Sequence, residues 1–356
     1  MTRPTASRRK GMASRVVVIG EHARAGLRSS LVSSFTHLGW HVDTVDWGPW
    51  QPAWLAAAAF RVPRLGASFR RWLRGRIRAL AALGPADLVV VLKGAMIDRP
   101  TIELARDQLC APVVCWNPDS PFDEAISNRG AGIPRAVAAY DCYVTWAQDV
   151  AAQLRSLNDH VVVIPFGWDP AIHRPTPGRG IAKDRIVFVG SATPERIALL
   201  GSIAHLHPMV FGNRWPAIEG IEVRPPVYGE EMSSIVGEAR WNLNLLRRQN
   251  ARSHNMRTFE LPGAGGNQVA PATPDHRTFL GHDSRTILYD STNDLPDILE
   301  TDPATFPSRR QDLLVGHTYV DRVMALLEML DLPVANVHVR PHESGSGPRR
   351  SSCASS

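Results

Sequence analysis

The sequence predicts two α/β domains of the Rossmann-like type, whose parallel sheets face each other across a cleft. Short apolar runs rich in β-branched residues alternate with longer helical stretches, which is the pattern of a parallel sheet covered by helices on both faces. This alternation stops at a segment rich in Pro and Gly and then starts again. A chain of 356 residues, 44% of them hydrophobic, is also long enough for two cores.

The first half, residues 15–168, has the alternation of one complete domain. Its strands are expected at RVVVIG (15–20), HVDTVDW (41–47), ADLVVVLKG (86–94), PVVCWN, YDCYVTW and VVVIPFGW (161–168). Helices are expected between them, at 25–38, in a long region rich in Ala and Arg, at 101–109 and at 148–157. Residues 1–14, which precede this domain, are predicted to be a disordered basic extension.

The second half repeats the pattern after an expected interdomain linker at 169–183. Residues 184–335 are predicted to form the second domain, with residues 336–356 as a disordered tail. Its expected strands are RIVFVG (185–190), PMVFG (208–212), IEVRPPV, WNLNLL (241–246), NQVAP and TILYD (286–290). Because open α/β sheets bind ligands at the carboxyl ends of their strands, we expect the binding site in the cleft between the two domains.

The net charge of +6 comes from the ends of the chain rather than from its body. Residues 1–15 carry five cations and no acid, and residues 336–356 carry three arginines against Glu343. The body is therefore close to neutral. This argues against nucleic acid as a partner, because a nucleic-acid-binding domain needs a basic stripe on its folded surface.

The four cysteines have neither CxxC spacing nor histidines at metal-ligand intervals, which predicts reduced thiols in a cytosol. No apolar run approaches the roughly 20 residues of a membrane span. Only the short run Val16 to Ile19 follows the basic start, rather than the apolar core of a signal peptide. We therefore expect a cytoplasmic protein.

The densest cluster of polar signals is SHNMRTFELPGAGGNQVAP, residues 253–271. Arg257 is expected at the start of a helix capped by Ser253 or Asn255, where free N–H groups, the helix dipole and a guanidinium converge on an anion. Glu260, one turn further, can accept hydrogen bonds from two ribose hydroxyls. The alternative is an ordinary helix end with an Arg–Glu pair on the surface.

The segment RTFELPGAGG resembles the RTFE-(I/L)-P-x-x-GG segment of the CgeB-like spore-maturation glycosyltransferases, relatives of the family-4 glycosyltransferases. Other segments are similar in the same order, among them DLVVVLKG, CWNPDSPF, AAYDCYVTWAQDV, IPFGWDPAIHRP, RIVFVGSATPERIALL, WNLNLLR and VGHTYVDRVMALLEML. The resemblance covers Val16 to Leu330. It implies a GT-B fold, a UDP-, GDP- or dTDP-linked sugar donor held mainly by the second domain, and a glycan, protein or small-molecule acceptor held mainly by the first.

The resemblance also implies roles for individual residues. Glu260 matches the second glutamate of the family-4 E-x7-E motif, a ribose-binding position, whereas the first glutamate falls on Arg252 and is absent. Arg196 follows the first strand of the second domain, where family-4 enzymes keep a basic residue for the diphosphate; the alternative is a solvated helix face. The residues expected to bind the donor are Gly190, Ser191, Arg196, Tyr228, Asn255, Arg257, Thr258, Glu260, Gly265 and Gly266.

The expected acceptor side lies in the first domain. Lys93 and Gly94 end a buried strand at the cleft edge. Asp119 follows another strand and can orient or deprotonate an acceptor hydroxyl, which is our candidate catalytic role; the alternative is a turn aspartate that caps a helix. We expect no covalent catalyst and, from the resemblance, retention of anomeric configuration. We expect neither metal nor cofactor, because arginines and a helix N-terminus can neutralise a diphosphate.

Arg61 to Arg78 holds seven arginines and no acid, with apolar residues at helical spacing. This pattern predicts a basic amphipathic helix. Such a helix can contact an anionic acceptor or the inner face of a membrane, although a solvated face above a packed stripe is the commoner origin.

Two other functions fit the same fold. A nucleotide-sugar epimerase would use the same donor site without a separate acceptor. A non-catalytic nucleotide-sugar-binding or surface-assembly protein would bind without turnover, since a fold does not guarantee an activity. The family resemblance favours a glycosyltransferase that acts on a cell-surface or spore-coat polysaccharide or on a protein glycan.

Overall fold

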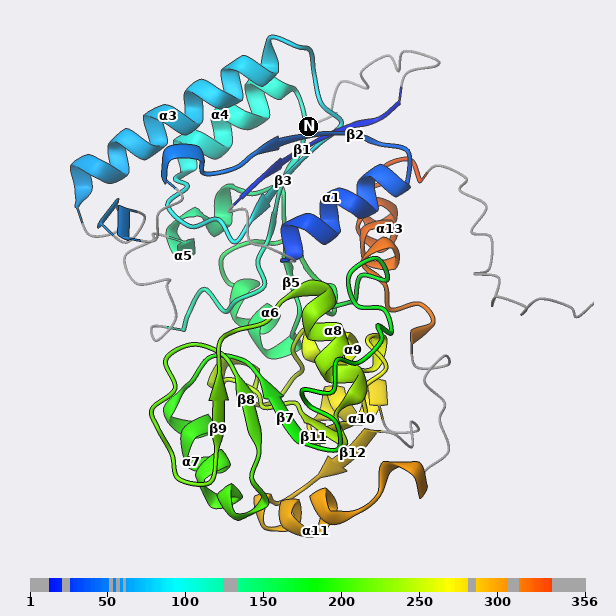
Figure 1. Cartoon of the computed structure of the whole chain (residues 1–356). Helices are drawn as coiled ribbons and strands as arrows, with labels where there is room; N and C mark the ends of the chain where they lie inside the picture. Colours follow the sequence, from blue (N-terminus) through cyan, green and yellow to red (C-terminus); the bar gives the residue numbers. More distant parts are fainter. Residues whose placement is uncertain are drawn as a thin grey trace, which may run out of the picture.

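The computed structural model describes residues 13–20, 26–50, 54–55, 58–59, 62–123, 133–280, 286–305 and 314–334. Within these ranges the chain forms two α/β domains, one above the other in Figure 1. The basic ends predicted at 1–14 and 336–356 lie outside the described residues, apart from residues 13 and 14.

The first domain is built on a parallel sheet whose six described strands run in the order β2-β1-β3-β4-β5-β6. Runs of Val and Ile form these strands because β-branched side chains fit a pleated surface that is buried on both faces. Val16, Val17 and Val18, for example, are all fully buried. The strands are β1 (Arg15–Ile19), β2 (His41–Val45), β3 (Leu88–Leu92), β4 (Val113–Trp116), β5 (Cys142–Thr145) and β6 (Val161–Val163).

Helices cover both faces of this sheet. Phe69 and Leu73 of α3 pack with Val17 on one face, and Leu31 of α1 packs with Val16 on the other, because neighbouring strand residues point to opposite sides. The helical segments are α1 (Leu27–His37), η1 (Gly48–Trp50), α3 (Pro63–Ala81), α4 (Arg99–Leu109), α5 (Ile133–Ala136), η2 (Val137–Ala139) and α6 (Gln148–Leu154).

The second domain has the same architecture, with a parallel sheet in the order β12-β11-β10-β7-β8-β9. Its strands are β7 (Ile186–Val189), β8 (Met209–Phe211), β9 (Glu222–Arg224), β10 (Trp241–Leu243), β11 (Gln268–Pro271) and β12 (Thr286–Tyr289). Its helical segments are α7 (Pro194–Ser202), η3 (Ala204–Leu206), α8 (Gly229–Glu238), η4 (Arg248–Asn250), α9 (Arg257–Gly263), α10 (Pro274–Leu280), η5 (Thr292–Asp294), α11 (Leu295–Glu300) and η6 (Pro303–Thr305).

Each sheet has a switch point at which the strand order reverses, between β1 and β3 in the first domain and between β7 and β10 in the second. Ligands of open α/β sheets bind at the carboxyl ends of the strands at such points. Lys93 follows β3, Ser191 follows β7 and Arg247 follows β10. Two of the predicted site residues, Lys93 and Ser191, therefore lie at strand ends next to the switch points, and the structure adds Arg247, which was not predicted.

The carboxyl-terminal edges of the two sheets meet. Ser120, which follows β4, donates its backbone N–H to Oε1 of Gln249, which follows β10, over 2.8 Å. The prediction of two Rossmann-like domains with facing strand ends is thus confirmed.

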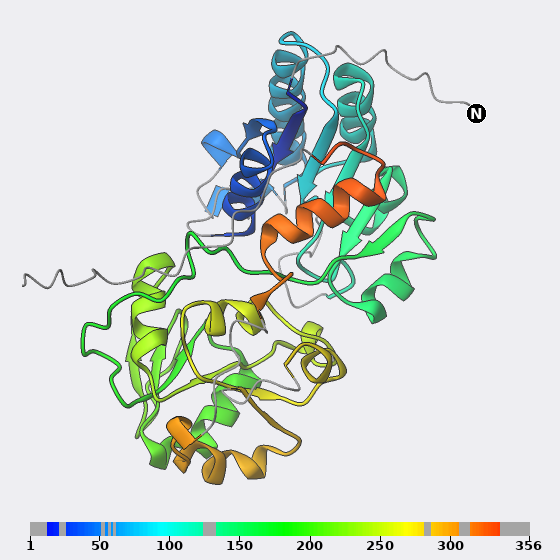
Figure 2. The same ribbon diagram turned by 90° about the vertical axis from the view of Figure 1, so that its right-hand side faces the viewer.

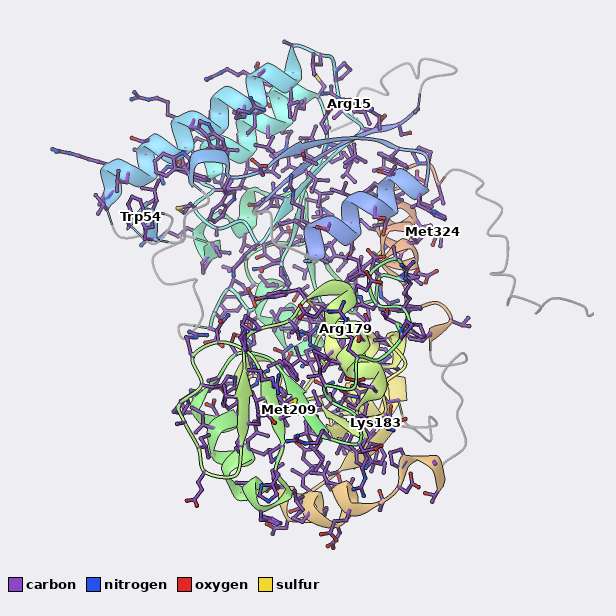
Figure 3. All side chains as sticks on the ribbon, viewed as in Figure 1. Arg15, Trp54, Arg179, Lys183, Met209 and Met324 are labelled. Carbon is purple, nitrogen blue, oxygen red and sulfur yellow. The ribbon has the colours of Figure 1, made fainter. Side chains whose placement is uncertain are left out.

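The last described helix, α13 (Tyr319–Met329), belongs to the first domain, although the sequence places it in the second. Val323 and Leu326 of α13 are fully buried in a core that contains Leu31 and Phe35 of α1. Both ribbon views show α13 alongside α1, and Met324 in Figure 3 marks its position. The predicted boundary of the second domain at residue 335 is therefore wrong, because the chain crosses back before α13.

Residues 169–183, predicted to be an interdomain linker, are packed on the second domain instead. The two carboxylate oxygens of Glu238 in α8 accept hydrogen bonds from the N–H groups of Gly180 and Ala182, each over 2.7 Å. Ala182 is fully buried in the core beneath α8, and Figure 3 shows the end of the segment at Lys183 within the second domain. Side-chain and backbone hydrogen bonds, rather than hydrophobic periodicity, fix this segment.

Candidate functional site

Arg196 is the central cation of the second domain's switch point. It lies in the first turn of α7, where the Thr193 side chain caps the helix. The guanidinium is 8% exposed; it donates to the carbonyl of Ser191 after β7, over 3.0 Å, and to that of Leu245 after β10. Arg196 therefore bridges the two strand ends between which the order reverses.

Three guanidinium groups gather around this point. Burial, together with the neighbouring charges of Arg247 and Arg257, lowers the pKa of Arg196 to about 10. The group remains a cation at neutral pH, since that value is still well above 7. The like charges of Arg247 and Arg257 make the protonated form of Arg196 less favourable, and an anion bound among the three groups would make it more favourable.

Arg257 and Glu260 form an ion pair at the start of α9. Nη1 of Arg257 donates to Oε2 of Glu260, and Nε of Arg257 lies 3.5 Å from the carbonyl of Val189 at the end of β7. The other Glu260 oxygen, Oε1, lies 3.6 Å from Nε2 of His173. Glu260 is 2% exposed and His173 is 3% exposed, so the carboxylate is buried between Arg257, which binds it, and the neighbouring His173 ring.

The helix cap predicted for α9 is wrong. The residue before the helix, Met256, supplies no side-chain hydrogen bond. The Ser253 hydroxyl donates instead to Asp275, over 2.5 Å, and the Asn255 amide donates to Oδ1 of Asn244, over 2.8 Å. Both candidate caps therefore bind other side chains. The groups available to an anion here are the arginines rather than a capped helix end.

Thr258, predicted to contact the donor, is fully buried among protein groups. Its hydroxyl lies 2.9 Å from Nε2 of His276, and Nδ1 of that ring lies 2.7 Å from the carbonyl of Pro271. Burial lowers the pKa of His276 to about 4, so the ring is neutral at pH 7. Thr258 therefore takes part in an internal network, and this arrangement offers it no direct contact with a donor.

The remaining donor-side predictions concern two residues after β7, Tyr228 before α8 and two glycines after α9. Gly190 and Ser191 continue from β7 next to Arg196, as the prediction requires. Tyr228 precedes α8 and is 44% exposed. The two glycines after α9 allow the turn into β11: Gly265 has φ +94°, and a Cβ on Gly266 would lie 2.5 Å from Cγ1 of Val236.

A small cavity of about 210 Å³ lies beside Arg196. Its apolar walls include Leu199, Leu245, Pro271 and Tyr289. A larger depression of about 700 Å³ lies at the opposite, amino-terminal edge of the first sheet, lined in part by Pro112, Asp141 and His160, and has none of the predicted site residues among its lining.

The first domain contributes Lys93 and Asp119. Nζ of Lys93 lies 2.7 Å from Oδ2 of Asp119. Oδ1 of Asp119 accepts a hydrogen bond from the side-chain amide of Gln249 over 2.9 Å, and its backbone N–H donates to Oδ1 of Asn117. The structure thus brings the two predicted acceptor-side residues together and joins them to the second domain.

Asp119 is ionised in this environment. Burial raises the pKa of its carboxyl, but the Lys93 charge, the Gln249 hydrogen bond and the Arg247 charge outweigh burial and leave the pKa below its ordinary value. Arg247 thus acts electrostatically on both Asp119 and Arg196, which places the acceptor-side carboxylate and the arginine cluster in one site.

Gly94 is required by the conformation that follows β3. Lys93 and Gly94 both have positive φ, 63° and 72°. A Cβ at Gly94 would lie 2.9 Å from the buried hydroxyl of Tyr140. The turn that directs Lys93 to Asp119 therefore depends on a residue without a side chain.

Sequence reasoning does not single out Arg247, Gln249 or His173. The first two come directly after the strand segment WNLNLL, and a polar residue at that edge of a parallel strand is a usable signal. His173 lies in a Pro-rich segment whose pattern carries no such signal.

Among the described residues, there is no cluster of three or more His, Cys, Asp or Glu side chains able to hold a metal ion. None of the helices in the described part of the chain combines the length and apolar character that a membrane crossing requires.

Comparisons with known proteins agree with the fold. Residues 195–328 match the family model described as "Glycosyl transferase-like", a segment that contains Arg196, Arg247, Arg257 and Glu260. A search of curated protein sequences finds no match to this chain.

Solved structures with similar folds include a UDP-forming α,α-trehalose-phosphate synthase from Burkholderia xenovorans, with a TM-score of 0.60 at 12% identity over 91% of this chain and 100% of that one. The glycosyltransferase AviGT4, involved in avilamycin A biosynthesis, gives 0.56 at 15% identity over 89% and 97%. A UDP complex of S. aureus MnaA gives 0.52 at 12% identity over 90% and 98%. At these identities the likeness shows the fold. The chain therefore has the GT-B fold of two Rossmann-like domains, and the segment that matches the glycosyl transferase-like family covers most of the second domain and continues into α13.

Proposed function

We propose that this protein is a glycosyltransferase that moves a sugar from a nucleoside-diphosphate-sugar donor to an acceptor hydroxyl. The observation that carries the proposal is the cluster of Arg196, Arg247 and Arg257 at the switch point of the second domain, with Glu260 as the carboxylate paired to it. On the acceptor side, Lys93 and Asp119 neutralise each other. The site thus keeps an excess of positive charge, which suits a diphosphate.

Donor binding would exchange partners within the Arg257–Glu260 pair. When Arg257 turns to the diphosphate, Oε2 of Glu260 becomes free to accept a ribose hydroxyl, while Oε1 still faces His173 at 3.6 Å. Arginine suits the diphosphate because its planar fork binds two oxygens at once. The same cations stabilise the charge that develops on the leaving nucleoside diphosphate, which lowers the barrier to transfer.

The base of the donor would lie against apolar side chains near this cation cluster. The cavity of about 210 Å³ beside Arg196 offers such walls from Leu199, Leu245 and Tyr289. We propose this cavity for the base in place of stacking on Tyr228, which stands exposed before α8.

On the acceptor side, an ionised Asp119 would accept a hydrogen bond from the attacking hydroxyl and take its proton as the bond to the sugar forms. Each carboxylate oxygen has two lone pairs, so the contacts with Lys93 and Gln249 leave room for a hydroxyl. We further propose a metal-independent reaction with retention of configuration. The CgeB-like resemblance favours an acceptor in a cell-surface or spore-coat glycan.

A binding protein without turnover is the second candidate, because Arg252 stands where the resemblance expects the first glutamate of the E-x7-E pair. Such a protein would keep the arginine cluster and bind the donor. It would show no release of nucleoside diphosphate in the presence of acceptors.

A thermal-shift panel of UDP, GDP, dTDP and ADP with their sugars tests the donor site, because a ligand of the native state raises the melting temperature by mass action. We expect one base to be selected. Glu260→Gln should reduce that shift strongly, whereas Glu230→Gln, an exposed carboxylate on α8, should leave it unchanged. A panel without any shift, or a Glu260→Gln protein that binds like the wild type, would refute the donor assignment.

We also propose peripheral contact of α3 with an anionic membrane surface. Phe69, Leu73 and Ile77 of α3 face the core, while Arg64, Arg71 and Arg78 are exposed at seven-residue spacing and thus lie on the opposite side. Arg70 and Arg74 are bound to Asp98 and are not part of this stripe; Arg61 lies outside the described residues.

Cosedimentation with vesicles tests the membrane contact. The wild type should bind vesicles that contain phosphatidylglycerol and release them at high salt, because each basic residue near such a surface adds about 1 kcal/mol. Substitution of Arg64, Arg71 and Arg78 by Gln should abolish binding, whereas Arg99→Gln on α4 should not. Equal binding to neutral vesicles would contradict an electrostatic contact.

A further inference from the structure

The side chain of Gln249, from the second domain, forms hydrogen bonds with Asp119 and Ser120 of the first domain. Its amide NH2 donates to Oδ1 of Asp119 over 2.9 Å. Its amide oxygen accepts from the backbone N–H of Ser120 over 2.8 Å. The two contacts use both ends of one amide on adjacent residues, so they specify the orientation of the Gln249 side chain as well as its position.

These contacts complete the surroundings of the Asp119 carboxylate. Oδ2 lies 2.7 Å from Nζ of Lys93, which comes from the same domain. Oδ1 is held by Gln249, 130 residues away in sequence and on the other domain. The orientation of the carboxylate therefore depends on how the two domains sit relative to each other.

Among the described residues, the chain passes from the first domain to the second near Phe166 and Trp168 and returns near Thr318. In the crossing segment, the carbonyl of Phe166 accepts hydrogen bonds from Arg322, and its N–H donates to Nε2 of His254 over 3.0 Å. Trp168 pairs with Thr318 of the returning chain. Both crossings thus lie side by side, which leaves the Gln249 contact as a separate link across the facing edges.

We propose that Gln249 is a positioning residue that orients Asp119 toward the acceptor only when the two domains are closed. The inference rests on the proposed function, because it assigns Asp119 to the acceptor. In the open protein, Asp119 would keep Lys93 but lose its second fixed contact. The acceptor-side carboxylate would then be ready for reaction only when the donor domain is in place, which limits unproductive encounters.

The test compares Gln249→Ala and Gln249→Glu with the wild type, with Arg248→Ala as the matched control on the same turn. Arg248 is exposed and has no contact with Asp119 among those the structure gives. Small-angle scattering of each protein, with and without saturating nucleoside diphosphate, reports domain closure without any need for turnover. We expect a larger radius of gyration for both Gln249 variants, and more so for Gln249→Glu, whose carboxylate would face Asp119.

Steady-state kinetics provide the second readout. Gln249→Ala should lower kcat/KM for the acceptor about tenfold, the usual effect of one hydrogen bond to a charged group, and leave donor affinity unchanged. The acid limb of the pH profile should move to higher pH, because burial raises the pKa of Asp119 and the Gln249 hydrogen bond opposes that rise. A merely structural loss would reduce activity without moving the profile.

The outcomes are distinct. A Gln249→Ala protein with wild-type scattering and a wild-type acceptor profile overturns the inference while leaving the glycosyltransferase intact. Loss of donor affinity in Gln249→Ala also overturns it, because Gln249 would then act on the wrong substrate. If no variant, including the wild type, transfers sugar, the proposed function fails, and an unchanged radius of gyration would remove the interdomain contact as well.

Discussion

The two sheets of this protein share one architecture but carry different charges at their carboxyl-terminal edges. In the second domain, Arg196, Arg247 and Arg257 surround the switch point, and Glu260 forms an ion pair with Arg257. In the first domain, Lys93 and Asp119 form a pair whose charges cancel. One edge therefore carries an excess of positive charge, whereas the charged pair at the other edge is neutral overall.

Two sheets of the same architecture can therefore differ in the charge at their strand ends through a few side chains. The surroundings of the two carboxylates differ in the same way. Glu260 is enclosed by partners and 2% exposed, whereas the Asp119 side chain keeps 17% of its surface exposed.

Removing the central cation of the second domain should have the largest effect. Arg196→Gln is expected to weaken binding of the preferred nucleoside diphosphate about a thousandfold, since two hydrogen bonds to a charged group are worth about 4 kcal/mol. Isothermal titration measures the affinity, and Arg248→Gln is the control. Equal affinities for the two variants would show that Arg196 only ties Ser191 to Leu245.

Acid should destabilise the second domain through the buried His276. Burial lowers the pKa of His276 from its ordinary 6.5 to about 4. Below pH 6.5, His276 is protonated in the unfolded chain, whereas in the folded protein it stays neutral until about pH 4. Stability is therefore lost as pH falls through this window, by about 3 kcal/mol.

Urea unfolding at pH 7 and pH 4.5, followed by fluorescence, measures that loss. His276→Gln should be less stable than the wild type at pH 7 and should depend less on pH, because no proton is taken up at this position. A variant with the full pH dependence of the wild type would assign the effect to other groups.

Gly94→Ala should destabilise the first domain by about 2 kcal/mol. The positive φ of 72° disfavours any side chain, and the new Cβ would meet the Tyr140 hydroxyl at 2.9 Å. Gly75→Ala in α3 is the matched control: no atom lies within 4 Å of its Cβ position, so this substitution should stabilise the helix slightly. Similar melting temperatures for the two variants would contradict a strained turn before the acceptor side.

Asp119→Asn should have the smallest effect on donor affinity, within about 0.5 kcal/mol of the wild type, while lowering transfer. The amide keeps the size of the carboxylate but cannot take the acceptor's proton. Titration with nucleoside diphosphate and a transfer assay separate the two properties. Weaker donor binding would place Asp119 on the donor side and erase the division between the domains.

The strands could be predicted from sequence because continuous β-branched runs are a local signal. The position of α13 could not, because its periodicity shows which face is apolar but not which domain covers that face. The segment 169–183 lacks periodicity and therefore resembles a linker, yet Glu238 binds its backbone. Such contacts are set by distant partners.

In the candidate site, too, some residues carry a local sequence signal and others do not. Arg196, Arg257 and Glu260 are indicated by their place after strands or at a helix start. Gln249 forms a hydrogen bond with Asp119, which is 130 residues away in the sequence, and no local sequence pattern predicts this contact. The capping prediction for α9 is wrong for a related reason, because the Ser253 hydroxyl donates its hydrogen bond to Asp275 on the next helix.

The return of α13 to the first domain has a consequence for how the protein is made. The first sheet is complete once Val163 has been synthesised, but the helix that covers part of one face begins at Tyr319. At ordinary rates of translation this delay is on the order of ten seconds. During that time, Val16, Leu31 and their neighbours lack the apolar surface of Val323 and Leu326. The core of the amino-terminal domain is therefore completed only after α13 has been synthesised. A fragment that stops at residue 168 would leave part of this core exposed to solvent.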